Sequence, residues 1–300
     1  MPLVSPTPLH SQTRNLVIVR AGDRSLHPAW LEGARAGHYD LIVSYFGNDP
    51  ARYRSPEEHR VDCKGGKWDG IHAVFASDPG LLDRYDYFWF PDDDIEADSA
   101  TVAEMFRLMA QHDLALAQPA LTHDSYFSFL LFLQCPSFRL RYANVIEIMV
   151  PCLRQDVLRQ VLPLFRETRS GFGLDFVWTR VLPDNRWKAA ILDSITVRHT
   201  RPVGGELHRK LAGRGESARA EQTRLMRRFN LERPKLLIYA GLTRGGTTVV
   251  SPWRLASMMG ADYFTARHRA VQRNWMTHLF RIVRRHVWYR TNLAQLAVSR

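Results

Sequence analysis

The sequence predicts an α/β protein in which helices flank a mainly parallel sheet, followed by a basic C-terminal extension. Apolar runs of strand length alternate with segments of helical pattern over the first two thirds of the chain, which is typical of βαβ units. The charge is uneven, because the first 200 residues carry 21 Lys+Arg and 25 Asp+Glu whereas the last 100 carry 20 and 5. The net charge of +11 therefore comes from the C-terminal third, which predicts a surface for an anionic partner.

Apolar runs bounded by turn residues define the elements of the first half of the chain. Thr101 and Glu104 match a capping box, so a helix is expected from there to about residue 112. The remaining patterns predict strands at 15–20, 39–46 and 85–90 and a helix at 68–77.

The second half is expected to continue the alternation and then change character. A strand is expected at 114–118, ending before Pro119, and Gly204–Gly215 forms the expected boundary. This boundary divides the chain into a domain over 1–205 and a basic extension over 206–300. Helices are expected at 155–165 and 174–182, and one or two strands are expected within 189–199.

The bulk composition is that of a globular protein, with 45% hydrophobic and 24% charged residues. No apolar run approaches the roughly 18 residues of a membrane span, and the N-terminal stretch lacks the pattern of a signal peptide. Cys63, Cys135 and Cys152 are odd in number and widely spaced, which argues against a disulfide framework or a zinc site. We therefore expect a cytoplasmic protein.

The stretch YDYFWFPDDDIEAD (85–98) carries the strongest chemical signal. Asp92, Asp93 and Asp94 directly follow a hydrophobic strand, and ligands of open α/β sheets bind at the carboxyl ends of strands. Adjacent carboxylates repel one another unless a proton or a cation intervenes, and Mg²⁺ or Mn²⁺ prefers oxygen ligands and brings phosphates. A metal–diphosphate site is thus predicted. The alternative is a solvated acidic turn leading into a helix, which suits Glu96 and Asp98 better.

A phosphohydrolase that uses the first aspartate as nucleophile is a second interpretation of Asp92-x-Asp94. Such enzymes need Thr or Val two residues past the second aspartate, near the start of the chain. Here that position holds Glu96, and a complete strand–helix unit precedes it. This interpretation therefore ranks below the metal–diphosphate site.

Five segments in order resemble a known family. A strand ending in Asp-Asp-Asp resembles the nucleotide-sugar site of GT-A-type glycosyltransferases, and the segments resemble the plant and bacterial domain of unknown function 707 family over about residues 14 to 205. The acidic turn of that family more often mixes Asp and Glu. The matching segments are KWDGIHAVFASDPGLLDRYDYFWFPDDDIEAD, LALAQPAL, VIEIMVP, GFGLDFVWTR and ILDSITVRHT.

The resemblance implies a GT-A-like (Rossmann-like) fold and assigns roles around the acidic turn. Asp94 would bind the metal, Asp92 would face the ribose and the metal, and Asp93 would support one or the other. Lys67, at a helix start beside two glycines, would contact the nucleotide or its diphosphate, since helix N-termini and Lys favour phosphate. The alternative for Lys67 is an ordinary surface lysine.

Two further positions take their roles from the resemblance. Asp175, after the glycines of SGFGLD, would be the catalytic base that takes the acceptor's proton in an inverting transfer, or else a helix cap. His199 would be the third metal ligand, or else a structural histidine. Arg198 and Arg201 would lie near the leaving diphosphate, although solvated charge is the default for both.

The basic extension contains a hairpin candidate and a helix candidate. Gly-rich residues around Thr243–Gly246 predict a hairpin rather than a phosphate loop, because the lysine that such a loop needs is missing. In Ala266–Tyr289 one face carries Val271, Trp275, Leu279, Ile282 and Val283, and the opposite face carries Arg273, Arg281, Arg284 and Arg285. This pattern predicts a helix lying on anionic lipid. A helix docked on the domain is an equal alternative, and RNA binding ranks lowest.

The combined expectation is a metal-dependent hexosyltransferase that uses Mn²⁺ or Mg²⁺ and a nucleoside-diphosphate sugar. Its acceptor would be a glycan or a lipid-linked sugar at the cytoplasmic membrane face. The rivals are a metal-dependent phosphohydrolase with the same aspartates and a non-catalytic membrane-surface or nucleic-acid adaptor that keeps the fold.

Overall fold

The computed structural model describes residues 13–33, 38–182, 187–204, 217–231, 235–271 and 275–289. Within these residues eleven strands form one mixed sheet in the order β11-β10-β7-β9-β6-β8-β4-β1-β2-β3, with β5 paired to β9. The strands are β1 (Asn15–Ala21), β2 (Asp40–Tyr45), β3 (His59–Asp62), β4 (Tyr87–Trp89), β5 (Ile95–Glu96), β6 (Leu116–Leu121), β7 (Phe138–Ala143), β8 (Cys152–Arg154), β9 (Ala189–His199), β10 (Ile238–Thr243) and β11 (Thr248–Val249).

The strand directions confirm the predicted α/β class. β3, β2, β1 and β4 run parallel to one another, and so do β6 and β9. The short strand β8 lies antiparallel between β4 and β6 and joins the two parallel groups. A mixed sheet of this kind, flanked by helices, is consistent with a GT-A-like fold.

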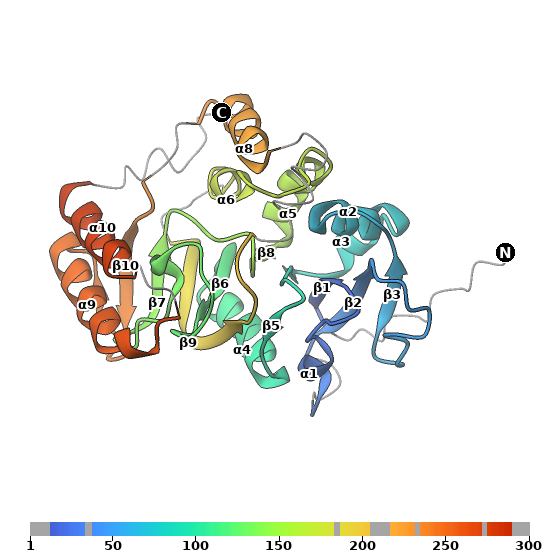
Figure 1. Cartoon of the computed structure of the whole chain (residues 1–300), viewed down its shortest axis with the longest axis horizontal. Helices are drawn as coiled ribbons and strands as arrows, with labels where there is room; N and C mark the ends of the chain where they lie inside the picture. The colour runs from blue at the N-terminus through green and yellow to red at the C-terminus, as the bar shows by residue number, and fades with distance from the viewer. Residues whose placement is uncertain are drawn as a thin grey trace.

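Helices cover both faces of the sheet and one of its ends (Figure 1). In Figure 1, α2, α3 and α5 lie above the strands, α1 and α4 lie below them, and α9 and α10 lie at the end opposite β3. The helices are α1 (Pro28–Leu31), α2 (Lys67–Ser77), α3 (Leu81–Arg84), α4 (Ser99–Gln111), α5 (Gln155–Val161), α6 (Leu174–Val177), α8 (Ala218–Arg228), α9 (Pro252–Thr265) and α10 (Trp275–Trp288), with short 3₁₀ turns at Leu130–Phe132, Leu162–Arg166 and Arg267–Arg269.

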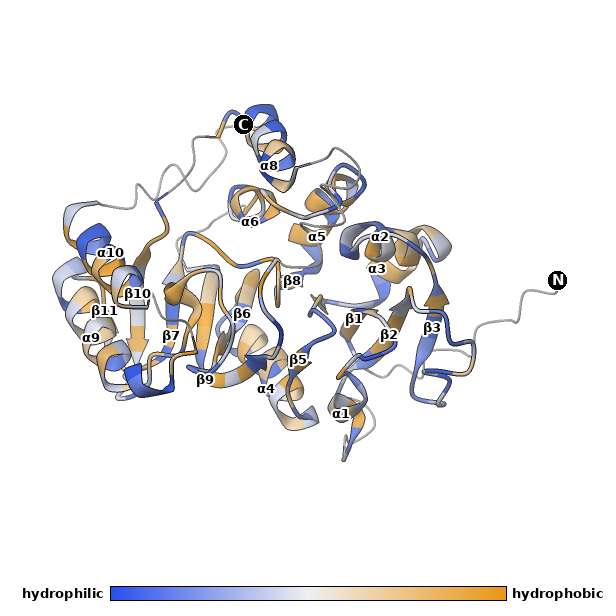
Figure 2. Ribbon diagram, in the orientation of Figure 1, coloured by the Kyte–Doolittle hydropathy of each residue, from blue (hydrophilic) through white to orange (hydrophobic). Residues whose placement is uncertain are grey.

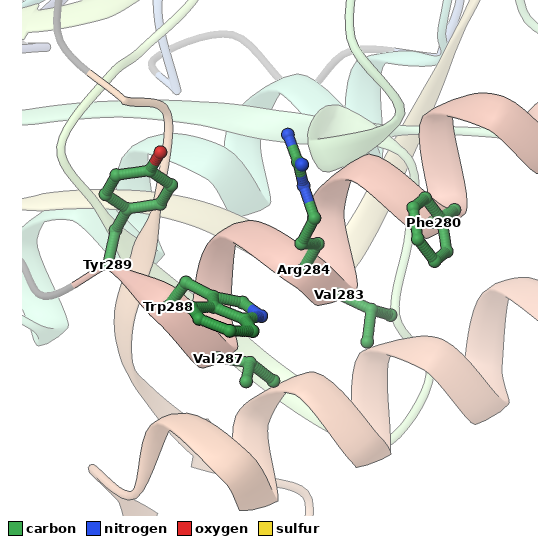
Figure 3. Close-up of a pocket in the computed structure, with 6 residues that line it drawn as sticks. All are labelled: Phe280, Val283, Arg284, Val287, Trp288 and Tyr289. Carbon is green, nitrogen blue, oxygen red and sulfur yellow. The ribbon is translucent and has the colours of Figure 1, made fainter.

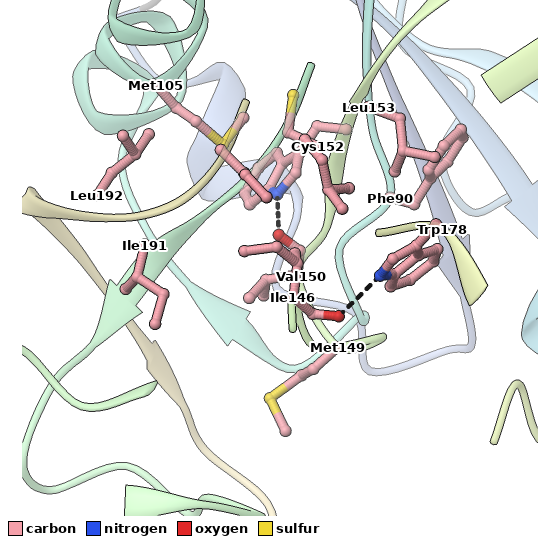
Figure 4. Packing of buried hydrophobic residues seen from close by; sticks show 14 of the residues in the cluster. Phe90, Met105, Ile146, Met149, Val150, Cys152, Leu153, Trp178, Ile191 and Leu192 are labelled. Atoms are coloured by element: carbon pink, nitrogen blue, oxygen red, sulfur yellow. Dashed lines mark hydrogen bonds between the residues drawn. The ribbon is translucent and has the colours of Figure 1, made fainter. Parts of the chain in front are cut away.

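The core explains why the central strands are apolar throughout. Strands that are covered on both faces have no solvent-facing side, so their sequences are hydrophobic runs rather than alternating patterns. Figure 2 shows hydrophobic colour along the central strands and hydrophilic colour on the outer surfaces of α8 and α10. Trp178 is fully buried, and its indole Nε1 donates a hydrogen bond to the carbonyl of Ile146 at 3.0 Å (Figure 4). Trp89 is bonded in the same way to Val150, so the segment between β7 and β8 is fixed to the core.

Several predicted boundaries are wrong, each for a local reason. The side chain of Asp98 accepts from the Thr101 N–H at 2.7 Å, so Asp98 caps α4 and the predicted capping box does not form. Pro119 lies inside β6 rather than after it, at the point where the pairing with β9 shifts register. A bulge of this kind tolerates the missing N–H of proline. The helix expected over 174–182 ends at Val177.

The C-terminal part joins the same sheet. The predicted hairpin is confirmed, because β10 and β11 pair antiparallel, and β10 also pairs with β7. The expected boundary around 205 falls outside the described residues, so the two-domain division stays a prediction. All three cysteines are unpaired. Among the described residues, no helix combines the length and apolar character needed to cross a membrane.

A buried ion pair links the neighbouring strands β7 and β9. Arg141 of β7 and Asp193 of β9 are both fully buried, and Nε and Nη2 of Arg141 contact the two carboxylate oxygens at 2.8 and 2.9 Å. Nη1 of Arg141 also donates to the hydroxyl of Tyr263 on α9 at 2.8 Å. Burial acts to raise the pKa of Asp193, and Arg141 opposes that effect. The pair therefore holds α9 onto the sheet.

Removing one member of this pair should be costly. We expect Asp193→Ala to lower the free energy of unfolding by about 3–5 kcal/mol, because it leaves the Arg141 charge buried and uncompensated. The control is Asp83→Ala, whose partner Arg159 and own carboxylate are both exposed and which should cost about 1 kcal/mol or less. Urea denaturation measures both changes, and similar costs for the two variants would contradict this assignment.

Candidate active site

The acidic turn lies at the carboxyl ends of the parallel strands. The N–H of Asp92 donates to the carbonyl of Met149 at 2.9 Å, and Arg20 at the end of β1 forms an isolated bridge with Asp92. These contacts place Asp92, Asp93 and Asp94 just past β4 and beside the end of β1, the edge at which open α/β sheets bind ligands. The location expected from the sequence is the location in the structure.

Asp92, Asp94 and His199 come together in a cluster that fits a divalent cation. One ligand atom from each lies within 4.8 Å of the others. The pairing of β5 with β9 sets Ile95 opposite His199, which brings the end of β9 to the acidic turn. Two carboxylates and an imidazole form a donor set that suits Mn²⁺ in particular, since Mg²⁺ strongly prefers oxygen.

The surroundings of His199 orient its ring toward this cluster. Nδ1 lies 2.9 Å from the carbonyl of Tyr126 and therefore carries a proton, and Nε2 lies 3.2 Å from Oδ2 of Asp94. Burial opposes the charged ring, but the carboxylates of Asp94 and Asp92 together with the Tyr126 carbonyl outweigh burial and raise the pKa of His199. A carbonyl on one ring nitrogen is the usual way to direct the other nitrogen at a metal, and a bound cation would replace its proton.

Lys67 neutralises the first aspartate. Its Nζ lies 2.6 Å from Oδ1 of Asp92 and also donates to the carbonyls of Ile148 and Met149 at 2.7 and 3.1 Å. Burial lowers the pKa of Lys67, and the Asp92 charge opposes this effect. Lys67 is the first residue of α2, as the sequence predicted, so an ammonium group and a helix N-terminus lie together beside the acidic turn.

Asp93 points to the other side of the turn and supports the loop after β1. Its Oδ2 accepts from the Gly22 N–H at 2.9 Å, and its Oδ1 pairs with Arg201 at 3.0 Å. Its carbonyl accepts from the Leu26 N–H at 2.8 Å. Burial raises the pKa of Asp93, and the Gly22 N–H and Arg201 oppose that effect. Asp93 thus supports the loop after β1, its expected role beside the ribose or metal stays a prediction, and Arg201 contacts the turn.

Arg198 is not part of the cluster. Its guanidinium pairs with Glu96 at 3.0 Å and with Asp124 at 2.9 Å. Successive side chains of a strand point to opposite faces, so Arg198 points away when its neighbour His199 points in. The expectation that Arg198 contacts the diphosphate is therefore not supported by its position.

Asp175 lies in the first turn of α6, half-buried, and is not the N-cap. The N-cap is Gly173, whose φ of 104° is readily adopted only by glycine, and its N–H donates to Oδ1 of Asp175 at 3.1 Å. The preceding loop is anchored to α8, because Glu221 accepts from the Ser170 N–H and from the hydroxyl of Thr168, both at 2.9 Å. Asp175 therefore follows a loop that α8 holds in place.

Two residues of the site were not predicted from the sequence. Arg20 is buried at the end of β1 and donates to the carbonyls of Cys63 and Gly65 at 2.8 and 3.0 Å, which fixes the loop that precedes Lys67. An arginine inside an otherwise apolar strand was the available signal. Glu147 is only 6% exposed, and its Oε2 has no hydrogen-bond partner within the described parts of the chain.

Glu147 lies next to the same site, because the carbonyls of the two residues that follow it bind Lys67. Burial, aided by Asp175 and Asp92, raises its pKa to about 7, while Ser128 and His199 oppose the rise. The signal in the sequence was a single acidic residue within the apolar run VIEIMV.

Comparisons with known proteins give weak likenesses only. No family model matches, and no curated protein matches. A mycobacterial protein of solved structure aligns with 73% of this chain and 75% of its own, at 13% identity and a TM-score of 0.45. The structure of S. aureus TarS in complex with UDP-GlcNAc aligns with 93% of this chain and over 74% of its own length, at 11% identity and a TM-score of 0.41.

A second structure of S. aureus TarS aligns with 61% of this chain, which spans only 59% of that structure, at 11% identity and a TM-score of 0.39. A Desulfovibrio desulfuricans protein that is provisionally described as a nucleotide-diphospho-sugar transferase aligns with 72% of this chain and over 98% of its own length. The identity is 13% and the TM-score is 0.38. All these TM-scores are below 0.5 and carry no conclusion about this chain. The function proposed for this protein therefore depends on the geometry of the site.

Proposed function

We propose that this protein is a metal-dependent glycosyltransferase with a GT-A-like catalytic unit, which transfers a hexose from a nucleoside-diphosphate sugar. The observation that carries the proposal is the cluster of Asp92, Asp94 and His199 at the carboxyl end of β4, with the ammonium group of Lys67 bonded to Asp92. A cation site beside a lysine at a helix N-terminus suits a diphosphate.

The residues of the cluster have separate roles in this proposal. Asp94, Asp92 and His199 hold Mn²⁺ or Mg²⁺, and the bound cation would neutralise negative charge on the leaving diphosphate. Lys67 sits where it can move from Asp92 to a diphosphate oxygen, because its Nζ already bridges Asp92 and two carbonyls. Asp93 orders the loop after β1, next to the expected nucleotide.

Asp175 is the proposed catalytic base. Its carboxylate lies in the first turn of α6 and accepts a hydrogen bond from the Gly173 N–H at 3.1 Å, a setting that favours negative charge. In an inverting transfer it would accept the proton of the acceptor hydroxyl as that oxygen attacks the anomeric carbon. The acceptor in this proposal is a glycan or a lipid-linked sugar at the cytoplasmic membrane face.

Nucleotide binding should depend on the metal. We expect UDP or GDP at about 100 times its Kd to stabilise the protein by about 2.7 kcal/mol in Mn²⁺ and much less in EDTA. Asp94→Asn should abolish the metal-dependent part, whereas the exposed control Asp83→Asn should retain it. Thermal-shift titrations measure both.

Equal stabilisation in Mn²⁺ and EDTA would rule out the metal bridge. Release of inorganic phosphate without an acceptor, with no transfer of sugar, would instead favour the phosphohydrolase. A protein that binds no nucleotide under either condition would favour the non-catalytic adaptor.

Loss of the base should separate binding from chemistry. We expect Asp175→Asn to keep the Kd for the donor within about twofold of the parent and to lower the transfer rate by roughly 10²–10⁴-fold, because only the proton acceptor is lost. Calorimetry and a nucleotide-release assay measure the two quantities. An Asn variant that turns over like the parent would leave Asp175 a purely structural role.

The C-terminal helix differs from its prediction in which face is covered. Ile282 is only 7% exposed, Leu279 packs against the core, and the buried His286 accepts from the Ile238 N–H at 2.8 Å. Part of the face expected to meet lipid is therefore a docking face. Val271 precedes α10, and Arg273 lies outside the described residues.

A second apolar stripe on α10 remains exposed. Phe280 and Trp288 are 70% and 77% exposed, and they line an open hollow of about 510 Å³ with Val283 and Val287 (Figure 3). Arg284 extends from the same stretch of helix in Figure 3. Aromatic side chains flanked by arginines match the chemistry of an anionic bilayer surface, and we propose that this stripe contacts such a surface.

The membrane contact is testable on the full chain. We expect binding to vesicles that contain anionic lipid and little binding to neutral vesicles, since each basic residue near the surface contributes about 1 kcal/mol. Phe280→Ala combined with Trp288→Ala should weaken binding at least tenfold, because burial of one such ring contributes about 1.5–3 kcal/mol. Vesicle co-sedimentation at low and high salt measures this.

Val203→Ala serves as the control, because Val203 is an exposed apolar residue outside α9 and α10. Its vesicle binding should equal that of the parent. A full-length protein that stays in the supernatant with anionic vesicles at low salt would refute the membrane contact.

A further inference from the structure

We propose that Glu147 binds a hydroxyl group of the transferred sugar and thereby helps to determine which donor the enzyme accepts. This inference rests on the proposed function and extends it to a residue with no role in the scheme above. It stands on three observations: an unsatisfied buried carboxylate oxygen, a rigid backbone on both sides of it, and its position among the groups of the site.

The first observation is the unsatisfied oxygen. Oε2 of Glu147 is buried and has no hydrogen-bond partner among the described residues. Buried carboxylates are nearly always paired or hydrogen-bonded, because removal from water without a partner is costly. A buried acceptor inside a ligand site is satisfied when the ligand supplies a donor, and sugar hydroxyls are such donors.

The second observation is the rigid backbone around Glu147. The N–H of Glu147 donates to the side chain of the fully buried Gln118 at 2.7 Å. The preceding carbonyl, of Ile146, accepts from Trp178, and the following two carbonyls accept from Lys67. The side chain is thus presented from a fixed segment, which is the requirement for selective recognition.

The third observation is the position of the carboxylate. The carbonyls of the two residues after Glu147 bind Lys67, which contacts Asp92 of the cation cluster, and the charge of Glu147 interacts with Asp92, His199 and Asp175. In the proposed function the cluster holds the diphosphate and Asp175 faces the acceptor. In that arrangement the transferred sugar lies between the cluster and Asp175, and Glu147 interacts electrostatically with both.

The acid–base state of Glu147 suits a hydroxyl ligand. Burial raises its pKa to about 7, so both protonation states are available near neutral pH. The carboxylate accepts a hydrogen bond from a sugar hydroxyl, and the protonated form can also donate one. Contact between Glu147 and an anionic phosphate is less favourable, because Glu147 already lies among negatively charged groups.

The test compares nucleoside diphosphates with their sugars. Calorimetry in Mn²⁺ gives the Kd of UDP, GDP, UDP-glucose, UDP-galactose, UDP-N-acetylglucosamine and GDP-mannose for the parent, Glu147→Gln, Glu147→Ala and the control Glu104→Gln, a partly exposed residue of α4. For the sugar that the parent binds best, we expect Glu147→Ala to weaken donor binding at least tenfold, with Glu147→Gln intermediate. The Kd of the free diphosphate should change by less than threefold, and the control should match the parent.

Melting temperatures without ligand distinguish a binding role from a structural one. Because Oε2 has no partner to lose, Glu147→Gln should melt at or above the temperature of the parent. Unchanged donor affinity in both variants would overturn the inference, and so would a lowered melting temperature with diphosphate binding lost as well. A parent that binds none of the diphosphates would show that the proposed function itself is wrong, and the inference would fall with it.

Discussion

The charge of the acidic turn is the constraint on which the site depends. Three consecutive carboxylates lie in a turn that is largely removed from solvent, and each is balanced by a cation from a different part of the chain. Asp92 contacts Lys67 of α2, Asp93 contacts Arg201 beyond β9, and Asp94 contacts His199. Because like charges at this spacing cannot all remain ionised unaided, the fold must bring these elements to one edge of the sheet.

That requirement explains features of the fold that otherwise look unrelated. The two-residue strand β5 pairs with the end of β9, and this pairing sets His199 opposite the turn. Arg20, at the end of β1, holds the carbonyls of the loop before α2 and thereby fixes where Lys67 begins. The insertion of β8 between β4 and β6 brings the carbonyl of Met149 to both Asp92 and Lys67. Local pairings thus serve a single electrostatic arrangement.

The sequence predicted those parts of the site that follow from strand ends. Asp92–Asp94 and His199 each follow or end an apolar run, so the carboxyl-edge rule placed them correctly. Arg198 was misplaced, although strand alternation separates it from His199. Glu147 is marked in the sequence only as an acidic residue within an apolar run, because its position depends on a non-regular segment held by Gln118 and Trp178 from distant elements. In α10 the helical-wheel pattern predicts one apolar face, but the packing of α10 on α9 determines which part of its apolar surface is buried.

The contrast between the balanced and the unbalanced carboxylates separates the roles within the site. Each of the three aspartates of the turn has a cationic or imidazole partner inside the protein. Glu147 lies in the same electrostatic field, and its Oε2 has no hydrogen-bond partner within the described chain. The raised pKa of Glu147 means that uptake of a proton can offset this unpaired charge. A protein keeps such a group at a cost in stability when a ligand completes it. The aspartates are thus arranged for a cation, whereas Glu147 is arranged for a neutral hydrogen-bond donor, and in the proposed function a hydroxyl group of the transferred sugar would be that donor.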